Sequence, residues 1–128
     1  MGAMDVVTKL SSRSVPDTVD RFTDILKSKN VRIFDVIDQS AAAKDAGLEL
    51  RATTLVIFGN PAAGTPVMVA EPMAALDLPL KVLVWDDEGQ TKVSYYDPAV
   101  QAAQYSLSPD LARGLAAINV LTDSLVAP

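Results

Sequence analysis

The chain has 128 residues, 49% hydrophobic and 21% charged, a size and balance that favour one globular domain. It has no histidine and no cysteine, which excludes disulfides, thiolate metal sites and the commonest acid–base and transition-metal chemistry. The net charge is −5 with scattered basic residues, and no apolar run approaches the ~20 residues of a membrane span, so neither nucleic-acid binding nor a membrane location is expected.

The first four residues, Met1–Met4, resemble a cloning scar that ends in a native initiator methionine. We therefore expect a single α+β domain over residues 5–128, with no internal repeat or linker. No signal-peptide pattern follows Met4, so the expected location is the cytoplasm.

The first third of the chain predicts a strand, a helix, a second strand and a short helix. Apolar and polar residues alternate over 6–11, as in a half-buried strand. Ser14 is a predicted N-cap, and a helix over 15–29 is indicated by a stripe of apolar residues at helical spacing: Val15, Val19, Phe22 and Leu26. Residues 31–38 are rich in β-branched side chains and predict the second strand. Ser40 is then expected to cap a short helix over 41–46, which Gly47 ends.

The middle of the chain predicts a central strand and an irregular helix. Residues 53–58 are apolar on both faces, which is typical of a strand covered on both sides. Asn60 is a natural N-cap and Pro61 a natural first helical residue, so a helix is expected over 61–70. Gly64 and Pro66 inside it make that helix irregular.

The last third predicts a hairpin and two helices. Strands 80–85 and 92–96 flank the polar turn 86–90, which indicates an antiparallel pair. Asp97-Pro98 and Ser108-Pro109 each predict a helix start, the last helix carrying an apolar stripe of Leu111, Leu115, Ile118 and Leu125. The order of elements predicts a two-layer α+β sandwich, with a mainly antiparallel sheet and helices packed on one face.

Four segments of the chain are unusually specific: TLVIFGNPAAGTPVM at 54–68, LDLPLKVLVWD at 76–86, VID at 36–38 and SYYDP at 94–98. Together they resemble a bacterial family known as domain of unknown function 302. The resemblance runs in matching order from about residue 12 to 107, and it implies a small α+β sandwich that forms a homodimer. It implies no activity.

Two positions depart from the pattern of that family. Its members carry a histidine directly after the aspartate that matches Asp38, where this chain has Gln39. A second histidine of the family lies in an Arg-His-Gly stretch that aligns with residues 104–106, where Tyr105 is central. Whatever those histidines do in other members, this chain has no imidazole at either position.

The segment from Gly59 to Thr65 is a strand-to-helix turn that allows two interpretations. A helix N-terminus can hold an anion, or Asn60 is simply a cap; we favour the cap. It is not a Walker loop, because Thr65 follows Gly64 where a lysine is required. The candidate ligand-binding residues of the chain are Asp38, Gln39, Asn60, Thr65, Lys81 and Asp97, and no catalytic residue is assigned.

Lys81 lies among apolar neighbours, so we expect it to be partly buried and to face a carboxylate, first Asp38 or Asp97. A structural ion pair is favoured over a catalytic lysine. The acidic turn 86–88 is interpreted as solvated rather than as a cation site, so no metal and no cofactor are expected. The aromatic residues Trp85, Tyr95 and Tyr96 are interpreted as core anchors.

Two functions of different class remain open. The first is a homodimeric module that binds a small ligand or a protein partner, and the absence of histidine and cysteine favours it. The alternative is an enzyme that uses carboxylate and lysine chemistry around Asp38, Lys81 and Asp97. The homodimer is expected because strands 55–58 and 80–85 are apolar on both faces, whereas a two-layer sandwich covers only one.

Overall fold

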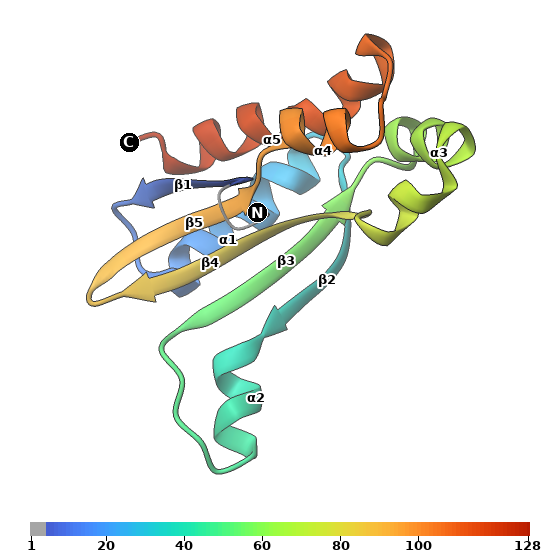
Figure 1. Cartoon of the computed structure of the whole chain (residues 1–128). Helices are drawn as coiled ribbons and strands as arrows, with labels where there is room; N and C mark the ends of the chain where they lie inside the picture. The colour runs from blue at the N-terminus through green and yellow to red at the C-terminus, as the bar shows by residue number, and fades with distance from the viewer. Residues whose placement is uncertain (1–4) are drawn as a thin grey trace.

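A five-stranded sheet with helices against one face forms the framework of the protein, in a computed structural model that describes residues 5–128 (Figure 1). The strands occur in the spatial order β1-β5-β4-β3-β2, and every neighbouring pair is antiparallel. Their bounds are β1 (Val6–Ser11), β2 (Arg32–Asp38), β3 (Thr53–Gly59), β4 (Leu80–Asp87) and β5 (Gln90–Tyr96). The predicted α+β sandwich with helices on one face is confirmed. The predicted scar at residues 1–4 lies outside the described residues.

The helices begin at the predicted caps with one exception. Their bounds are α1 (Val15–Ser28), α2 (Gln39–Asp45), α3 (Pro61–Ala70), α4 (Pro98–Gln104) and α5 (Pro109–Val126), and a 3₁₀ helix, η2 (Pro72–Leu76), was not predicted. The side chains of four residues accept a hydrogen bond from a backbone N–H of the first turn that follows them, as an N-cap does: Ser14, Asn60, Asp97 and Ser108.

The exception is α2, which Asp38 caps in place of Ser40. The Asp38 carboxylate accepts from the Ala41 N–H at 2.9 Å and from the Ser40 hydroxyl at 2.7 Å, so Ser40 supports the cap from inside the helix. Gly47 follows the helix with a φ of 79°, the left-handed conformation that glycine adopts without strain. No residue of α2 is buried, and the helix projects from the ends of β2 and β3 (Figure 1).

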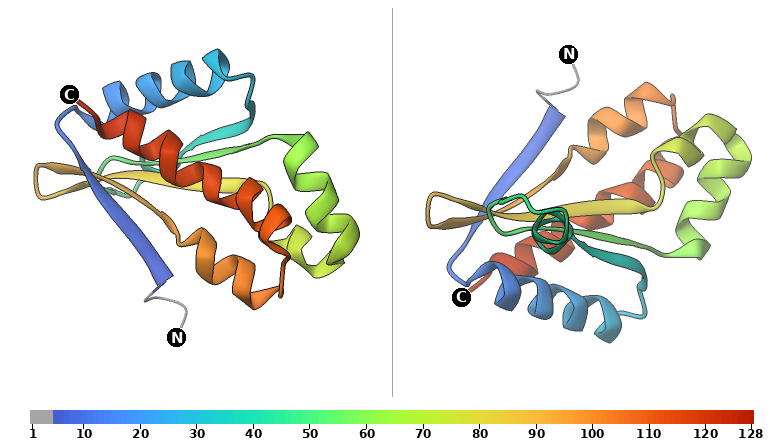
Figure 2. Two further views of the ribbon diagram at one scale, coloured as in Figure 1. Left: turned by 90° about the horizontal axis from the view of Figure 1, so that it is seen from above. Right: turned by 90° about the horizontal axis from the view of Figure 1, so that it is seen from below.

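The core lies between the sheet and α1 and α5. The helix-facing residues of β3 and β4 are fully buried: Val56, Phe58, Val82 and Val84. Phe22 of α1 meets Phe58 edge-on, with their ring centroids 5.1 Å apart. Seen from above, α5 crosses the sheet with α1 and α4 on either side of it (Figure 2).

The opposite sheet face is covered by no helix among the described residues. Leu55, Ile57, Leu83 and Trp85 alternate with the buried set and are only half-buried. We call this surface the open face. Tyr95 points into the core, but Tyr96 is 52% exposed, so its prediction as a core anchor is wrong; strand alternation places it on the other side from Tyr95.

The β4–β5 hairpin turns more tightly than predicted. Glu88 and Gly89 have φ values of 50° and 94°, the left-handed pair of a two-residue hairpin turn, so both strands extend to Asp87 and Gln90. The acidic turn is also not purely solvated, because the Lys92 ammonium donates to the Asp87 carboxylate at 2.6 Å.

Candidate functional site

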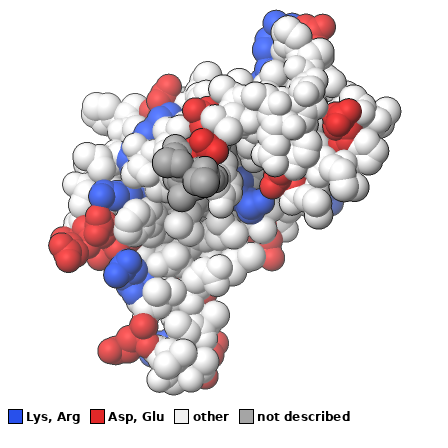
Figure 3. Space-filling view, in the orientation of Figure 1, with Lys and Arg blue, Asp and Glu red and all other residues white. Residues whose placement is uncertain are grey.

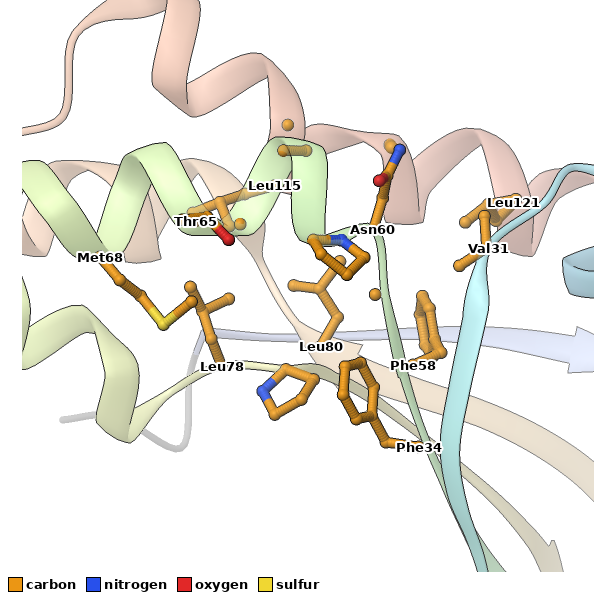
Figure 4. Close-up of a pocket in the computed structure, with 17 residues that line it drawn as sticks. Val31, Phe34, Phe58, Asn60, Thr65, Met68, Leu78, Leu80, Leu115 and Leu121 are labelled. Carbon is orange, nitrogen blue, oxygen red and sulfur yellow. The ribbon is translucent and has the colours of Figure 1, made fainter.

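An apolar pocket of about 330 Å³ lies where α3 and α5 meet the ends of β2, β3 and β4. Figure 4 shows Thr65 and Met68 of α3 above Leu78 and Leu80, with Phe34 and Phe58 at the sheet side. The remaining lining residues are Val31, Gly59, Asn60, Pro61, Ala63, Gly64, Pro79, Gly114, Leu115, Ala117 and Leu121. Asn60 and Thr65 supply the polar side chains of this lining, and no Asp, Glu, Lys or Arg belongs to it.

The strand-to-helix turn builds one side of this pocket. Asn60 directly follows β3 and caps α3, its Oδ1 accepting from the Ala62 N–H at 3.0 Å. The N–H groups of Ala63 and Gly64 donate to the Asn60 carbonyl, each at 2.9 Å, and Pro61 has no N–H. The first N–H groups of α3 are therefore already hydrogen-bonded, so they are not available to an anion, and this favours the interpretation of Asn60 as a cap.

Two glycines let the pocket walls approach closely. A Cβ on Gly114 of α5 would lie 3.1 Å from the Cβ of Ala63, so α3 and α5 touch at this point through their backbones. A Cβ on Gly59 would lie 3.6 Å from Pro79 and 3.8 Å from Phe34, within ordinary contact. Gly64 is different, because a Cβ there would meet nothing within 4 Å.

Phe34 reaches the pocket because β2 is irregular. The β2–β3 register shifts between Ile33 and Asp35, so Phe34 is the extra residue of a β-bulge and its ring is 45% exposed. The bulge also explains why Asp35 breaks the alternation of the sequence. The Arg32 guanidinium lies 4.9 Å from the Phe34 ring centroid, in cation–π range, but Arg32 does not line the pocket.

Of the six candidate ligand-binding residues, the structure brings Asn60 and Thr65 together at this pocket. Asp38 and Gln39 lie at the start of α2, and Asp97 caps α4 by accepting from the Ala99 N–H at 2.9 Å. Hydrogen bonds from the Ser40 hydroxyl and the Ala41 N–H hold the pKa of Asp38 below its ordinary value. This is the behaviour of an exposed cap.

Lys81 lies on the open face, where it is paired with Ile57 of β3 and is half-buried as predicted. The predicted carboxylate partner is wrong: within residues 5–128, no carboxylate lies within ion-pair distance of its ammonium. Asp38 pairs with Thr54, three residues along β3 from Ile57, and its carboxylate is occupied by the cap.

Gln39 and Tyr105, the two positions that were compared with family histidines, lie far apart in this chain. Gln39 begins α2, whereas Tyr105 follows the last residue of α4, and these two helices lie at different ends of the molecule (Figure 1). The Tyr105 hydroxyl donates to the Asp77 carboxylate, and this bond raises the pKa of Tyr105 above its ordinary value. That bond joins α4 to the segment between η2 and β4, next to the pocket residue Leu78.

The sequence contained partial signals for the pocket. The turn from Gly59 to Thr65 was identified as a candidate, but the apolar residues facing it come from α5, β2 and the segment before β4. Periodicity marks such residues as buried without telling which of them leave a space between them. Only the packing of α3 against α5 at Gly114 defines the cavity.

The chemistry available elsewhere on the described part of the chain is limited. Residues 5–128 contain no group of three or more His, Cys, Asp or Glu placed to hold a metal ion. No helix within the same range is long and apolar enough to cross a membrane. On the side shown in Figure 3 the charged side chains are scattered among uncharged atoms.

The fold is also found in a solved structure. The crystal structure of an uncharacterized conserved DUF302 protein from Bacillus stearothermophilus superposes with a TM-score of 0.80 over 96% of each chain, at 19% sequence identity. Similarity at that identity describes the fold alone.

Curated relatives match over part of their length. The chain is 41% identical over 103 residues to a fluoride-specific ion channel, FluC 1, of Brucella suis, and equally to FluC 2 of Brucella melitensis. This match covers 80% of the present chain but only 41% and 38% of those proteins, so the chain spans about two fifths of their length. The sequence model of the family described as domain of unknown function DUF302 matches residues 7–125, and the chain therefore belongs to that family.

Proposed function

We propose that the protein is a binding module that takes up a small, mainly apolar molecule in the pocket between α3, α5 and the sheet. The observation that carries this proposal is the pocket itself, about 330 Å³ in volume and lined by apolar side chains with Asn60 and Thr65 as its polar groups. Ligand pockets of proteins have volumes of about 300–1,000 Å³ and this kind of lining.

The separation of the titratable candidates supports binding over catalysis. The enzyme alternative needs Asp38, Lys81 and Asp97 in one site, but they lie at the α2 cap, on the open face and at the α4 cap. The pocket lining contains no group that titrates near neutral pH.

Occluding the pocket tests this proposal. Gly64 and Met68 are one helical turn apart on α3 and both line the pocket, so a leucine at position 64 projects into the space. We expect wild-type protein to bind the neutral fluorescent probe N-phenyl-1-naphthylamine and to melt at a higher temperature with it. Gly64→Leu should weaken probe binding at least about tenfold, which is a loss of about 1.4 kcal/mol.

The matched control is Ala62→Leu, on the exposed side of the same helix and outside the lining. It adds the same side chain without entering the pocket, so it should bind the probe like wild type. Equal probe binding by both variants would place the probe elsewhere and contradict the proposal.

We also propose that the module is a homodimer joined through the open face. Two observations support this: the half-buried apolar side chains of β3 and β4 on that face, and the segment between α2 and β3, where Leu48 is 66% exposed. Apolar side chains that gather on one exposed face are typical of an interface. The expected cytoplasmic location stays a prediction, which cell fractionation tests.

The Brucella relatives are consistent with a module that can be joined to another protein. Their names describe a fluoride-specific ion channel, but the resemblance takes up 41% and 38% of their lengths. We propose that this part of those proteins is an attached domain rather than the conducting part. Fluoride transport is not part of the function proposed for this chain.

A further inference from the structure

We infer that the ligand of this pocket is an uncharged amphiphile, with an apolar body inside the cavity and one neutral hydrogen-bonding head group at the Thr65 hydroxyl. This inference rests on the proposed binding function and adds the charge and shape of the ligand to it. Four features of the pocket carry it.

The first feature is the lack of charge in the lining. No acidic or basic side chain is among the residues around the cavity, and its floor is made of buried residues such as Phe58, Leu115 and Leu121. An ion that enters such a space loses its hydration without gaining a counter-charge, which is strongly unfavourable. A neutral molecule does not carry that cost.

The second feature is the start of α3. A free helix N-terminus would attract a carboxylate or phosphate head group. Here the Asn60 side chain and carbonyl already take the N–H groups of Ala62, Ala63 and Gly64, and Pro61 offers none. No backbone donor of this first turn remains for an anion.

The third feature is the pair of polar side chains. Within residues 5–128, the Thr65 hydroxyl and the Asn60 Nδ2 group have no hydrogen-bond partner in the protein, while Asn60 Oδ1 is occupied by the cap. The hydroxyl donates and accepts, and the amide nitrogen donates. The Thr65 hydroxyl can therefore bind a neutral oxygen, such as that of an alcohol or an amide, whereas the Asn60 side chain points in a different direction (Figure 4) and offers only its amide nitrogen.

The fourth feature is size. A cavity of about 150 Å³ holds one benzene molecule, and this pocket has roughly twice that volume. A chain of medium length or a two-ring body fits it. The Arg32 guanidinium lies over the ring of Phe34, which lines the pocket, but Arg32 itself is not a lining residue. Arg32 is therefore the cation to test if an anion binds.

The experiment compares three ligands that share one chain: 1-octanol, octanoate and octylammonium. Each compound is added to wild-type protein that carries N-phenyl-1-naphthylamine, and displacement of the probe is measured near neutral pH. At that pH octanoate is an anion and octylammonium is a cation. We expect 1-octanol to displace the probe at a concentration at least tenfold lower than either ion. Thr65→Val keeps the shape of the side chain and removes the hydroxyl, so it should weaken the binding of 1-octanol about fivefold or more.

The other outcomes overturn the inference in distinguishable ways. If octanoate binds as tightly as 1-octanol, and Arg32→Gln weakens the binding of octanoate alone, the ligand is an anion. An unchanged 1-octanol affinity in Thr65→Val would mean simple partitioning without head-group recognition. If none of the three compounds displaces the probe, but Gly64→Leu still prevents probe binding, the amphiphile class is wrong and the proposed binding function stands. If the probe does not bind to wild-type protein at all, the proposed binding function itself is wrong.

Discussion

Lys9 on β1 is joined to α5 by three contacts of one ammonium group. Its Nζ lies 2.7 Å from Asp123 Oδ1, 2.6 Å from Thr122 Oγ1 and 3.1 Å from the Asn119 carbonyl. The Tyr95 ring lies 5.3 Å away, in cation–π range. Only 19% of the Lys9 side chain is exposed, so these contacts hold the edge strand to the last helix.

The protonation of Lys9 links this contact to pH. Burial lowers the pKa of Lys9, but hydrogen bonding to Asp123 and Tyr95 outweighs it, and the pKa lies above its ordinary value of 10.5. A raised pKa in the folded state means that the stabilisation is fully present below pH 10.5. It is lost as the pH rises through the folded-state pKa.

We therefore expect Lys9→Met to lower the free energy of unfolding at pH 7 by about 1.5–3 kcal/mol, the range of hydrogen bonds to a charged group. Asp123 is 71% exposed and stays hydrated, and Thr122 keeps its bond to the Ile118 carbonyl, so no buried group loses its partner. Denaturant unfolding measures the difference. As a control, Lys27→Met at an exposed position should change the free energy of unfolding by less than about 0.5 kcal/mol.

The same pair of proteins checks the pH dependence. The difference between wild type and Lys9→Met should shrink above pH 10.5, as the ammonium of the wild type loses its proton. A difference that is as large at pH 11 as at pH 7 would mean that the contact acts through packing of the stem rather than through charge.

At the scale of helices and strands, the helix starts were the most predictable part of the sequence. Ser14, Asn60, Asp97 and Ser108 each precede a proline by one or two residues, and this pattern fixes a helix start locally. At α2 the predicted cap was Ser40, but the observed cap is Asp38. Both are capping residue types, and only their geometry decides between them.

What the sequence did not reveal depends on contacts between distant elements. η2 begins at Pro72, but Glu71 before it makes no side-chain cap, so its sequence carries only the proline half of the start signal. The predicted pair between Lys81 and a carboxylate failed because apolar neighbours on a strand show burial, but not whether the other layer of the sandwich covers that face. The pocket requires the register of α3 against α5, which no local pattern encodes.

Substitutions at two glycines test the packing of α3 and α5, because they should change the stability of the protein in opposite directions. Gly114→Val should destabilise the protein by about 1–3 kcal/mol, because the new Cβ would lie 3.1 Å from the Ala63 Cβ and force the helices apart. Gly64→Ala should stabilise it by about 0.5–1 kcal/mol, since its Cβ meets nothing within 4 Å and alanine restricts the unfolded chain.

Thermal and denaturant unfolding of these variants give the comparison. Ala116→Val on the exposed side of α5 controls for the poorer helix propensity of valine and should cost less than about 1 kcal/mol. Gly114→Val should also weaken binding of N-phenyl-1-naphthylamine, because Gly114 and Ala63 both line the pocket. A Gly114→Val protein as stable as Ala116→Val would mean that the two helices do not pack as closely as described.

At the scale of the whole molecule, the two faces of the sheet differ in how far they are covered. The helix-facing side is completed by α1 and α5, with Val56, Phe58, Val82 and Val84 fully buried. On the open face a polar group of Thr8, Ser94 and Trp85 is hydrogen-bonded across β1, β5 and β4, and half-buried leucine and isoleucine side chains lie beside it. A fixed polar group inside an apolar surface is typical of interface patches, which combine apolar area with a few directed bonds.

The homodimer proposal predicts a particle of twice the 13.6 kDa chain mass by light scattering at micromolar concentration. Leu83→Glu should convert it to a single chain, because a carboxylate at the centre of the open face would lose its hydration in the interface. Val120→Glu, at a position of α5 that is 64% exposed, adds the same charge away from that face and should stay dimeric.

Stability supplies a second readout that does not depend on particle size. If association stabilises the folded chain, the melting temperature of wild type and Val120→Glu rises with protein concentration, whereas that of Leu83→Glu does not. Circular dichroism establishes that Leu83→Glu is folded before the comparison is made. A wild-type melting temperature that is independent of concentration, together with a 13.6 kDa particle, would mean that the open face is not the interface between two copies.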